Sequence, residues 1–414
     1  MKESMRPNQE PKRPGQTEPR VLMLLENESI PEDTRVVLEA ESLIEAGYQV
    51  SVICPTGRSR KWVETVGRIT VYRYPAIFEV RGFWGYMLEY SYSLLALFLW
   101  SILIFLRRGF DVVHVHTPPD MTSTIAIFYK IFGKRFVFDH HDLSPELYLA
   151  QVPNRKPNSV YHLLRFFERL ACRNADRLIA TNETQRSMQI ERCGADPDRC
   201  TVVRNGPNES FLGDVIANAE IDAPEKIVLG YVGAIGFQDG VDYIIHVVKQ
   251  LRMVHGRDDF LAVIIGDGPA LAHLKTLAKQ LDVENLIHFT GKIPFAEVPS
   301  CIAAFDICLT PDPSNAYNDS CTTIKTMEYM ALRKPIVCFR TTENQRTVAD
   351  AALYADNNDV ADFASQTIRL MDDESLRSQL GTIGRQRIDG GLTWHHQSPQ
   401  LITLYDRLLY RIQA

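Results

Sequence analysis

The segment NDSCTTIKTMEYMALRKPIVCF, residues 318–339, carries the clearest chemical pattern in the chain. A helix is expected to begin between Ser320 and Thr323, where small hydroxyl side chains suit a helix N-terminus. Free amides at such a terminus bind anions, and Lys325 adds a positive charge one turn later. Glu328, three residues further on, shares the face of Lys325. This spacing can hold a diphosphate while Glu328 accepts hydrogen bonds from ribose hydroxyls, although a capped helix with a surface Lys–Glu pair has the same spacing.

Two histidines and two aspartates stand together in FDHHDLSPELY, at residues 139–142. These side chains are common metal ligands, and His114 and His116 point to one face of another predicted strand. A metal-dependent sugar hydrolase or deacetylase is therefore one interpretation. Against it, successive side chains of an extended strand alternate in direction, so the four side chains of DHHD cannot all converge.

Strands and helices alternate along the chain and must position these residues. VLMLL (21–25) is a continuous apolar run typical of a strand covered on both faces, followed by a helical pattern ending at Gly47 and by the strand YQVSVICP. This order begins a doubly wound parallel sheet. It continues to TVVRNGP (201–207) and restarts at IVLGYVG (227–233). Ligands bind beyond the carboxyl ends of such strands, so two facing halves would enclose a cleft.

We therefore expect an α/β protein with two doubly wound, Rossmann-like domains. The predicted parts are a disordered tail (1–19), an N-terminal domain (20–207), a polar linker (208–226), a C-terminal domain (227–390) and a C-terminal helix (391–414). The tail lacks the apolar stretch of a secretory signal, and its Pro, Gln, Glu and Lys content is typical of disorder.

Composition limits the class of protein further. The 414 residues include 45 Lys and Arg against 51 Asp and Glu, a formal net charge of −6, and 45% are hydrophobic. These values are typical of a soluble globular protein and argue against a nucleic-acid binder, which usually has a basic balance. The eight cysteines form no CxxC pair and several lie in apolar runs, as expected for reduced, buried thiols in the cytoplasm.

The segment KTMEYMALRKPIV, residues 325–337, resembles the ribose- and phosphate-binding helix of glycosyltransferase family 4, whose members are retaining nucleotide-sugar transferases with the GT-B fold. Other segments agree with the family in the same order along residues 20–414. They are IPEDTRVVLEAESLIEAGYQVSVICP, DVVHVHTPPD, FDHHDLSPELY, VVRNGP, GYVGAIGFQDGVDYII and VIIGDGPALAHLKTLA.

The resemblance implies a retaining glycosyltransferase that moves a sugar, such as a hexose, from a nucleotide-diphosphate sugar to an acceptor. It also implies two domains facing across a cleft, with the C-terminal helix crossing back to the N-terminal, acceptor-binding domain. Neither a cofactor nor a metal ion is expected. The implied partners are the donor and a glycan or lipid-linked acceptor, in the synthesis of a cell-surface polysaccharide or glycolipid.

Two positions depart from the family's pattern. The Glu that usually precedes the ribose-binding Glu by eight residues is Ser320 here, and Asp319 beside it is the candidate for that carboxylate. The loop GAIGFQDG (233–240) has Gln and Asp at 238–239, where the family usually has a Lys. Arg204 is the candidate for the missing positive charge, and an ordinary surface arginine is the alternative.

Pattern and resemblance together define the candidate site. The candidate catalytic residues are His141, which the resemblance matches to a sugar-contacting histidine, Asp319, Lys325 and Arg204. The candidate donor-binding residues are Gly233, Gly266, Gly268, Lys292, Thr322, Thr323, Ile324 and Glu328, and the candidate acceptor-side loop holds Asp33 and Arg35. Two further alternatives stay open: a nucleotide-sugar epimerase of the same fold, and a noncatalytic nucleotide-sugar binder that lacks two of the usual residues.

The most apolar run in the chain is LLALFLWSILIFLRR, residues 94–108. Its uncharged core, Leu94 to Leu106, is shorter than the ~20 residues needed to span a bilayer. The favoured interpretation is a core helix packed on the sheet. The alternative is a helix that lies in the membrane interface with Arg107 and Arg108 at headgroup level, which would place the enzyme at the inner face of the membrane.

Overall fold

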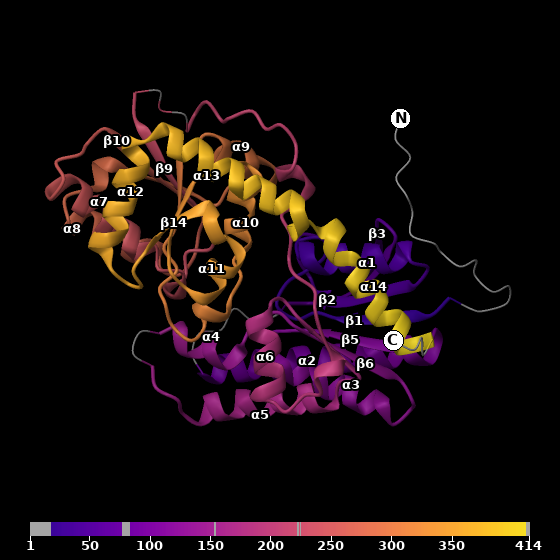
Figure 1. Cartoon of the computed structure of the whole chain (residues 1–414). Coiled ribbons are helices and arrows are strands. Elements are labelled where there is room, and N and C mark those ends of the chain that lie inside the picture. Colours follow the sequence, from indigo (N-terminus) through magenta and orange to yellow (C-terminus); the bar gives the residue numbers. More distant parts are fainter. Residues whose placement is uncertain (1–17, 77–82, 153–154, 222, 224, 411–414) are drawn as a thin grey trace, which may run out of the picture.

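The computed structural model describes residues 18–76, 83–152, 155–221, 223 and 225–410. Each half of the chain forms one sheet flanked by helices (Figure 1). The prediction of an α/β protein with two doubly wound domains is confirmed. Residues 1–17 of the predicted tail and residues 411–414 of the predicted C-terminal helix lie outside the described residues.

The N-terminal sheet has the strand order β3-β4-β2-β1-β5-β6-β7-β8, parallel except for the antiparallel pair β3 and β4. Its strands are β1 (Arg20–Leu24), β2 (Gln49–Pro55), β3 (Val63–Val66), β4 (Ile69–Tyr74), β5 (Val112–His116), β6 (Arg135–His140), β7 (Arg177–Ala180) and β8 (Cys200–Val202). Its helices are α1 (Thr34–Glu45), α2 (Phe83–Arg107), α3 (Ser123–Lys130), α4 (Ser144–Ala150), α5 (Ser159–Asn174) and α6 (Glu183–Glu191). Four consecutive residues of β1 are buried, because a central parallel strand is covered on both faces.

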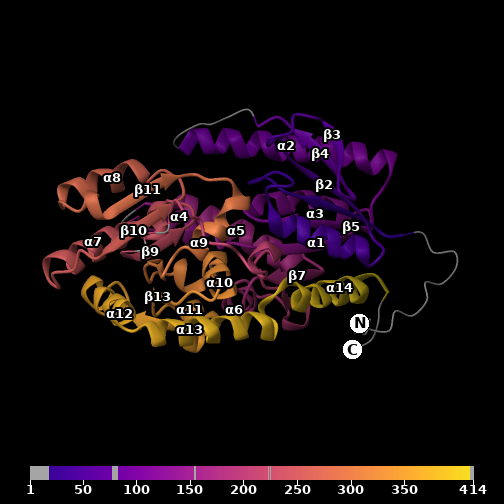
Figure 2. The same ribbon diagram turned by 90° about the horizontal axis from the view of Figure 1, so that it is seen from above.

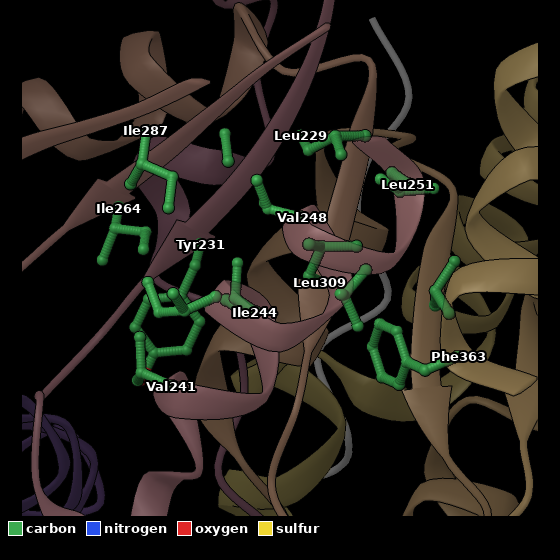
Figure 3. Packing of buried hydrophobic residues seen from close by; sticks show 14 of the residues in the cluster. Leu229, Tyr231, Val241, Ile244, Val248, Leu251, Ile264, Ile287, Leu309 and Phe363 are labelled. Carbon is green, nitrogen blue, oxygen red and sulfur yellow. The ribbon is translucent and has the colours of Figure 1, made fainter. Parts of the chain in front are cut away.

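The C-terminal sheet is parallel throughout, in the order β11-β10-β9-β12-β13-β14. Its strands are β9 (Ile227–Val232), β10 (Phe260–Ile265), β11 (Ile287–Gly291), β12 (Ile307–Thr310), β13 (Ile336–Phe339) and β14 (Ala352–Ala355). Its helices are α7 (Val241–Met253), α8 (Leu271–Gln280), α9 (Val298–Ala303), α10 (Ile324–Ala331), α11 (Thr342–Thr347), α12 (Val360–Asp372) and α13 (Glu374–Arg387). Figure 3 shows part of its core, in which Ile244 and Val248 of α7 share one cluster with Tyr231 of β9 and Phe363 of α12.

The last helix, α14 (Trp394–Tyr410), leaves the C-terminal domain and packs on the N-terminal one (Figure 1). Its Tyr405 Oη lies 2.9 Å from His114 Nδ1, and its Trp394 Nε1 donates to Ser42 Oγ at 2.9 Å. Leu401 and Leu404 join the hydrophobic cluster that lies under β1 and α1. The predicted crossing of the C-terminal helix is thus present.

Helix α2 contains most of the apolar run at residues 94–108 and is 25 residues long. Leu97 and Ile104 are buried against the sheet, whereas Leu95 and Leu99 are exposed. The core-helix interpretation therefore holds for one side of this helix only.

Candidate active site

Loops that follow the strands of both sheets meet between the two domains. Tyr317 Oη donates to Asp142 Oδ1, just after β6, at 3.1 Å. Asn182, the N-cap of α6, donates through Nδ2 to the carbonyl of Ser320 at 2.9 Å and to Thr322 Oγ1 at 3.2 Å. These contacts hold the segment before α10 against the N-terminal domain.

Helix α10 begins at Ile324, and its N-cap Thr323 makes no capping bond through its side chain. Thr323 Oγ1 instead lies 2.7 Å from Thr326 Oγ1. The first amides of α10 therefore have no partner from the N-cap side chain and remain available to an anion. Ile324 is partly exposed at this helix start, whereas the rest of the helix is largely buried.

Lys325 points back toward the ends of β9 and β12. Its Nζ forms an ion pair with Asp312 Oδ1 at 2.9 Å and lies 4.9 Å from the centre of the Tyr231 ring. Burial by itself would lower the pKa of Lys325, but Asp312, Tyr231 and Asp239 raise it above its usual value, so the ammonium stays charged. Asp312 was not among the predicted site residues.

Glu328 is buried on α10 with 8% of its surface exposed, and burial raises the pKa of its carboxyl to about 7. Lys325 pairs with Asp312 and not with Glu328 in the described part of the chain, so the alternative of a surface Lys–Glu pair is wrong. The Glu328 carboxyl has no hydrogen-bond or ion-pair partner among the described residues, and such a partly desolvated carboxyl is suited to accept hydrogen bonds from hydroxyl groups.

The two candidates for the missing family Glu lie in a short turn before α10. Ser320 is buried and its hydroxyl donates to the carbonyl of Tyr317 at 2.6 Å, so its one donor is already engaged. Asp319 is half-buried, and its carboxylate accepts from Ser314 Oγ at 3.1 Å. Burial raises the pKa of Asp319. Of the two, only Asp319 offers a carboxylate to the site.

Glycines let the loops after β9 and β10 approach each other. Gly266 has a φ of 145°, and a Cβ at this position would lie 1.9 Å from the carbonyl oxygen of Gly233. A Cβ on Gly268 would lie 2.4 Å from the carbonyl oxygen of Ile235. Side chains at either position would push the two loops apart. Lys292, just after β11, is exposed.

His141 contacts two buried side chains, those of Asp139 and Arg35. Its Nε2 lies 2.7 Å from Asp139 Oδ2, to which a protonated Nε2 donates, and 3.1 Å from Arg35 Nε. Arg35 also donates to both oxygens of Asp139, at 3.2 and 3.0 Å, and to Asn205 Oδ1 at 2.7 Å. Burial alone would raise the pKa of Asp139, but Arg35 and His141 hold it well below its usual value.

Asp33 and Arg35, which were predicted to lie together in an acceptor-side loop, have different positions in the structure. Arg35 lies in the first turn of α1 and points into the domain, with only 6% of its side chain exposed. Asp33 is the N-cap of α1 and accepts from the amide of Val36 at 3.0 Å. Of the two, only Asp33 remains at the loop.

The described residues contain one group with metal-ligand spacing, and it is not DHHD. One ligand atom each from Glu39, His114, His116 and Asp139 lies within 4.8 Å of the others. His140 points to the other side of the sheet, where its Nε2 lies 3.8 Å from Glu168. The group fits a cation poorly, because Arg35 already occupies both oxygens of Asp139 and Tyr405 bonds His114. Glu39, which α1 places beside His114 and Asp139, was not among the predicted site residues.

Arg204 follows β8 and is half-buried, in contact with residues of α11 and α14. Its amide donates to Gln397 Oε1 at 3.2 Å, and its Nη1 lies 3.5 Å from Thr347 Oγ1. No ion pair of Arg204 occurs among the described residues, so its charge is not neutralised there. Arg204 is therefore a cation without a carboxylate partner near the junction of the domains.

Comparisons with known proteins agree with this architecture. Residues 34–211 match the family model described as Glycosyltransferase Family 4, and residues 216–387 match the model described as Glycosyl transferases group 1. The two matches correspond to the N-terminal and the C-terminal domain. Since the two matches together cover most of the chain, it belongs to glycosyltransferase family 4, and its two parallel-sheet domains have the GT-B fold.

Several relatives and solved structures are similar to this chain. D-inositol 3-phosphate glycosyltransferase of Salinispora tropica is 27% identical over 56% of this chain, and the match spans 51% of that protein. 2-Deoxystreptamine glucosyltransferase of Streptomyces kanamyceticus is 26% identical over 73% of this chain and 80% of that protein. Sucrose-phosphate synthase from Thermosynechococcus elongatus matches with a TM-score of 0.78 and 16% identity over 95% of this chain and all of that chain. WaaG, a glycosyltransferase involved in lipopolysaccharide biosynthesis, matches with a TM-score of 0.71 and 16% identity over 93% and 99%.

Proposed function

We propose that this glycosyltransferase moves a sugar from a nucleotide-diphosphate sugar to an acceptor hydroxyl, with retention at the anomeric carbon. The observation that carries the proposal is the arrangement of α10, whose open N-terminus, buried Lys325 and buried, unpaired Glu328 lie together. A nucleoside diphosphate needs an anion site and a hydroxyl acceptor at this spacing. Anabaena HepE, a similar structure with a TM-score of 0.70 and 14% identity over 94% of this chain and 99% of that one, was solved in complex with UDP and glucose.

In this proposal the residues have distinct tasks. Glu328 accepts hydrogen bonds from the ribose, and His141 orients the sugar. Lys325, Arg204 and the first amides of α10, after Thr322 and Thr323, stabilise the charge that builds on the leaving diphosphate. Asp319 supplies the carboxylate that the family usually places on a Glu. Backbone at Gly233, Gly266 and Gly268 approaches the nucleotide, with Lys292 beside the base.

Retention follows if the acceptor attacks the anomeric carbon on the side of the leaving group. The acceptor oxygen then forms the new bond to carbon as the bond to the diphosphate oxygen breaks. The acceptor proton passes to a phosphate oxygen of the departing nucleotide. No base from the protein is needed for this step, and its demand is charge stabilisation at the diphosphate.

We propose that the acceptor enters a pocket of about 230 Å³ beside the ends of β1, β2 and β4. Among the described residues, its lining includes Glu26, Glu28, Glu89 and Tyr74 and no Lys or Arg. Burial raises the pKa of Glu26 to about 7, and nearby Glu89 adds to the shift. This pocket suits a hydroxyl-rich acceptor without anionic charge near the transfer point. We further propose a role in polysaccharide or glycolipid synthesis, at the inner face of the membrane.

The test is a thermal-shift screen of nucleotide sugars against the whole chain, followed by product analysis. A ligand present at a hundredfold excess over its dissociation constant stabilises the protein by about 2.7 kcal/mol. The donor found in this way should yield a new glycoside when a hydroxylated acceptor is supplied. Conversion of the donor to an isomer without acceptor would instead support an epimerase. Binding with neither transfer nor hydrolysis would support the noncatalytic binder.

A further inference from the structure

Helix α2 and the end of α3 expose large apolar side chains side by side. Exposed fractions on α2 are 53% for Leu88, 57% for Leu95, 58% for Leu99 and 76% for Leu106. Just after α3, Ile131 is 78% exposed and Phe132 51%. The two elements touch, since the rings of Phe98 and Phe128 are 5.3 Å apart and those of Phe105 and Phe132 are 5.6 Å apart. We call this the α2–α3 surface.

The spacing of the exposed leucines places them along one side of α2. Leu95 and Leu99 are one turn apart, and Leu88 and Leu106 lie two turns beyond them at either end. The opposite side holds Leu97 and Ile104, which belong to the buried cluster of the N-terminal domain. Figure 2 shows α2 along the outside of this domain. A monomeric soluble protein rarely leaves such a continuous apolar strip uncovered.

Leu88–Arg107 is long and apolar enough to cross a membrane by length and composition. A spanning orientation would, however, pull Leu97 and Ile104 out of the core and separate Ser101 from Tyr129, whose hydroxyls are 2.9 Å apart. The helix therefore stays on the sheet and can meet a membrane only lengthwise, with its exposed side.

Positive charge gathers where α2 ends. A hollow of about 540 Å³ there is lined by Arg20, Arg68, Arg107 and Arg108, with Glu18 as its acidic member. Arg68 pairs with Glu45, whereas Arg107 and Arg108 form no ion pair among the described residues. The chain as a whole has a net charge of −6, so the positive charge around this hollow is opposite in sign to that of the whole protein. Exposed arginines beside an apolar helix favour anionic lipid headgroups.

We propose that the α2–α3 surface docks on an anionic lipid bilayer, with α2 lying flat, its leucines at the acyl boundary and Arg107 and Arg108 among the headgroups. The other end of α2 carries Glu89 and Ser93 into the proposed acceptor pocket. Docking would therefore place that pocket at the bilayer, where a lipid-linked acceptor is held. The docking itself rests on the surface and not on the proposed chemistry of the cleft.

The experiment is co-sedimentation of the full chain with vesicles of phosphatidylcholine alone or mixed with phosphatidylglycerol. The protein should bind the mixed vesicles, and Leu95→Glu/Leu99→Glu should lower that binding by at least about tenfold, because two charges would enter the acyl boundary. Arg107→Ala/Arg108→Ala should weaken binding to the mixed vesicles and reduce its dependence on salt. The matched control is Leu163→Glu/Phe166→Glu on α5, where the exposed fractions are 43% and 58%.

Failure of docking can be told apart from failure of the proposed function, because donor binding is measured by thermal shift without vesicles. The leucine variant should keep the melting temperature and donor response of the wild type. No binding of the wild type to mixed vesicles would overturn the proposal. Equal loss in the α5 control, or conversion of a wild-type dimer to a monomer by the leucine substitutions, would also overturn it.

Discussion

Lys325 Nζ lies 2.9 Å from Asp312 Oδ1, and both side chains are buried where β12 ends and α10 begins. The ammonium that should meet the donor diphosphate thus has a carboxylate partner before any ligand binds. The pair keeps Lys325 charged and in place, but it also offsets part of the charge offered to a phosphate. Additional cations are then needed when the diphosphate leaves.

Lys325→Ala should lower turnover by on the order of 100-fold or more, because a contact to the developing charge is lost. It should also destabilise the protein by about 3–5 kcal/mol, since Asp312 would be left buried without a partner. Lys325→Ala/Asp312→Asn should regain stability in a thermal melt and stay inactive. Recovery of activity in the double variant would show that Lys325 has a structural role only.

Nucleotide affinity should rise from about pH 6 to about pH 8, because the ribose hydroxyls donate to the ionised form of Glu328, whose pKa in the free protein is about 7. Glu328→Gln should flatten this profile, and Glu328→Ala should weaken binding more than about tenfold, as expected from a charged hydrogen bond of about 1.5–3 kcal/mol. Titration calorimetry across the pH range is the measurement. An unchanged affinity in both variants would remove Glu328 from the site.

The Glu328 carboxyl should also make the folding stability of the ligand-free protein depend on pH. Its folded pKa of about 7 lies above the ordinary value of 4.5, so the folded state binds the proton more tightly than the unfolded state does. The contribution of Glu328 to folding is therefore most favourable at low pH and is lost as the pH rises through 7. Relative to the wild type, Glu328→Gln should gain melting temperature at pH 8 and not at pH 5. A constant difference would mean that Glu328 titrates normally.

Arg204→Ala should lower turnover more than it weakens binding of the bare nucleoside. We propose that this arginine, which has no carboxylate partner among the described residues, compensates for the lysine missing from the loop after β9. Installing that lysine as Gln238→Lys in the Arg204→Ala background should recover part of the loss. Steady-state kinetics and nucleoside titration separate the two effects. Near-wild-type kinetics for Arg204→Ala would leave Lys325 and the helix amides as the diphosphate ligands and strengthen the binder alternative.

Activity should survive treatment with EDTA, because both oxygens of Asp139 are engaged by the Arg35 guanidinium, where a cation would need them. Metal analysis of the purified protein accompanies the assay. Stoichiometric zinc whose removal abolishes activity would contradict this and favour the hydrolase interpretation.

Asp139→Asn should lower turnover while leaving nucleotide affinity unchanged, since His141 would lose its anionic partner.

The fold was predictable because its signals are local. Continuous apolar strands such as β1 and the restart at residues 227–233 need no distant information. The helix start at Thr323 and the tight, glycine-containing turn at residues 266–269 also follow from nearby residue types. The sequence pattern therefore predicted the strands and the start of α10 closely.

Pairings between distant elements could not be predicted in the same way. Asp312 reaches Lys325 only once β12 and α10 are packed, and Glu39 and Asp139 come together although they are 100 positions apart in the chain. Arg35 has the sequence position of a loop residue, yet its partners Asp139 and Asn205 draw it inward. Such contacts depend on tertiary packing, which spacing along the chain does not encode.

The return of α14 to the first half of the molecule has a consequence for engineering. The N-terminal domain is discontinuous in sequence, because Tyr405 and Leu404 complete a core that begins with Val21 and Met23. A chimaera joined at a single point between the two domains would take His114 from one protein and Tyr405 from another. Helix α14 would then pack on an N-terminal domain with which it did not evolve. Exchanging the N-terminal domain between relatives therefore requires that both ends of the chain be transplanted together, with the C-terminal domain kept as an insert between them.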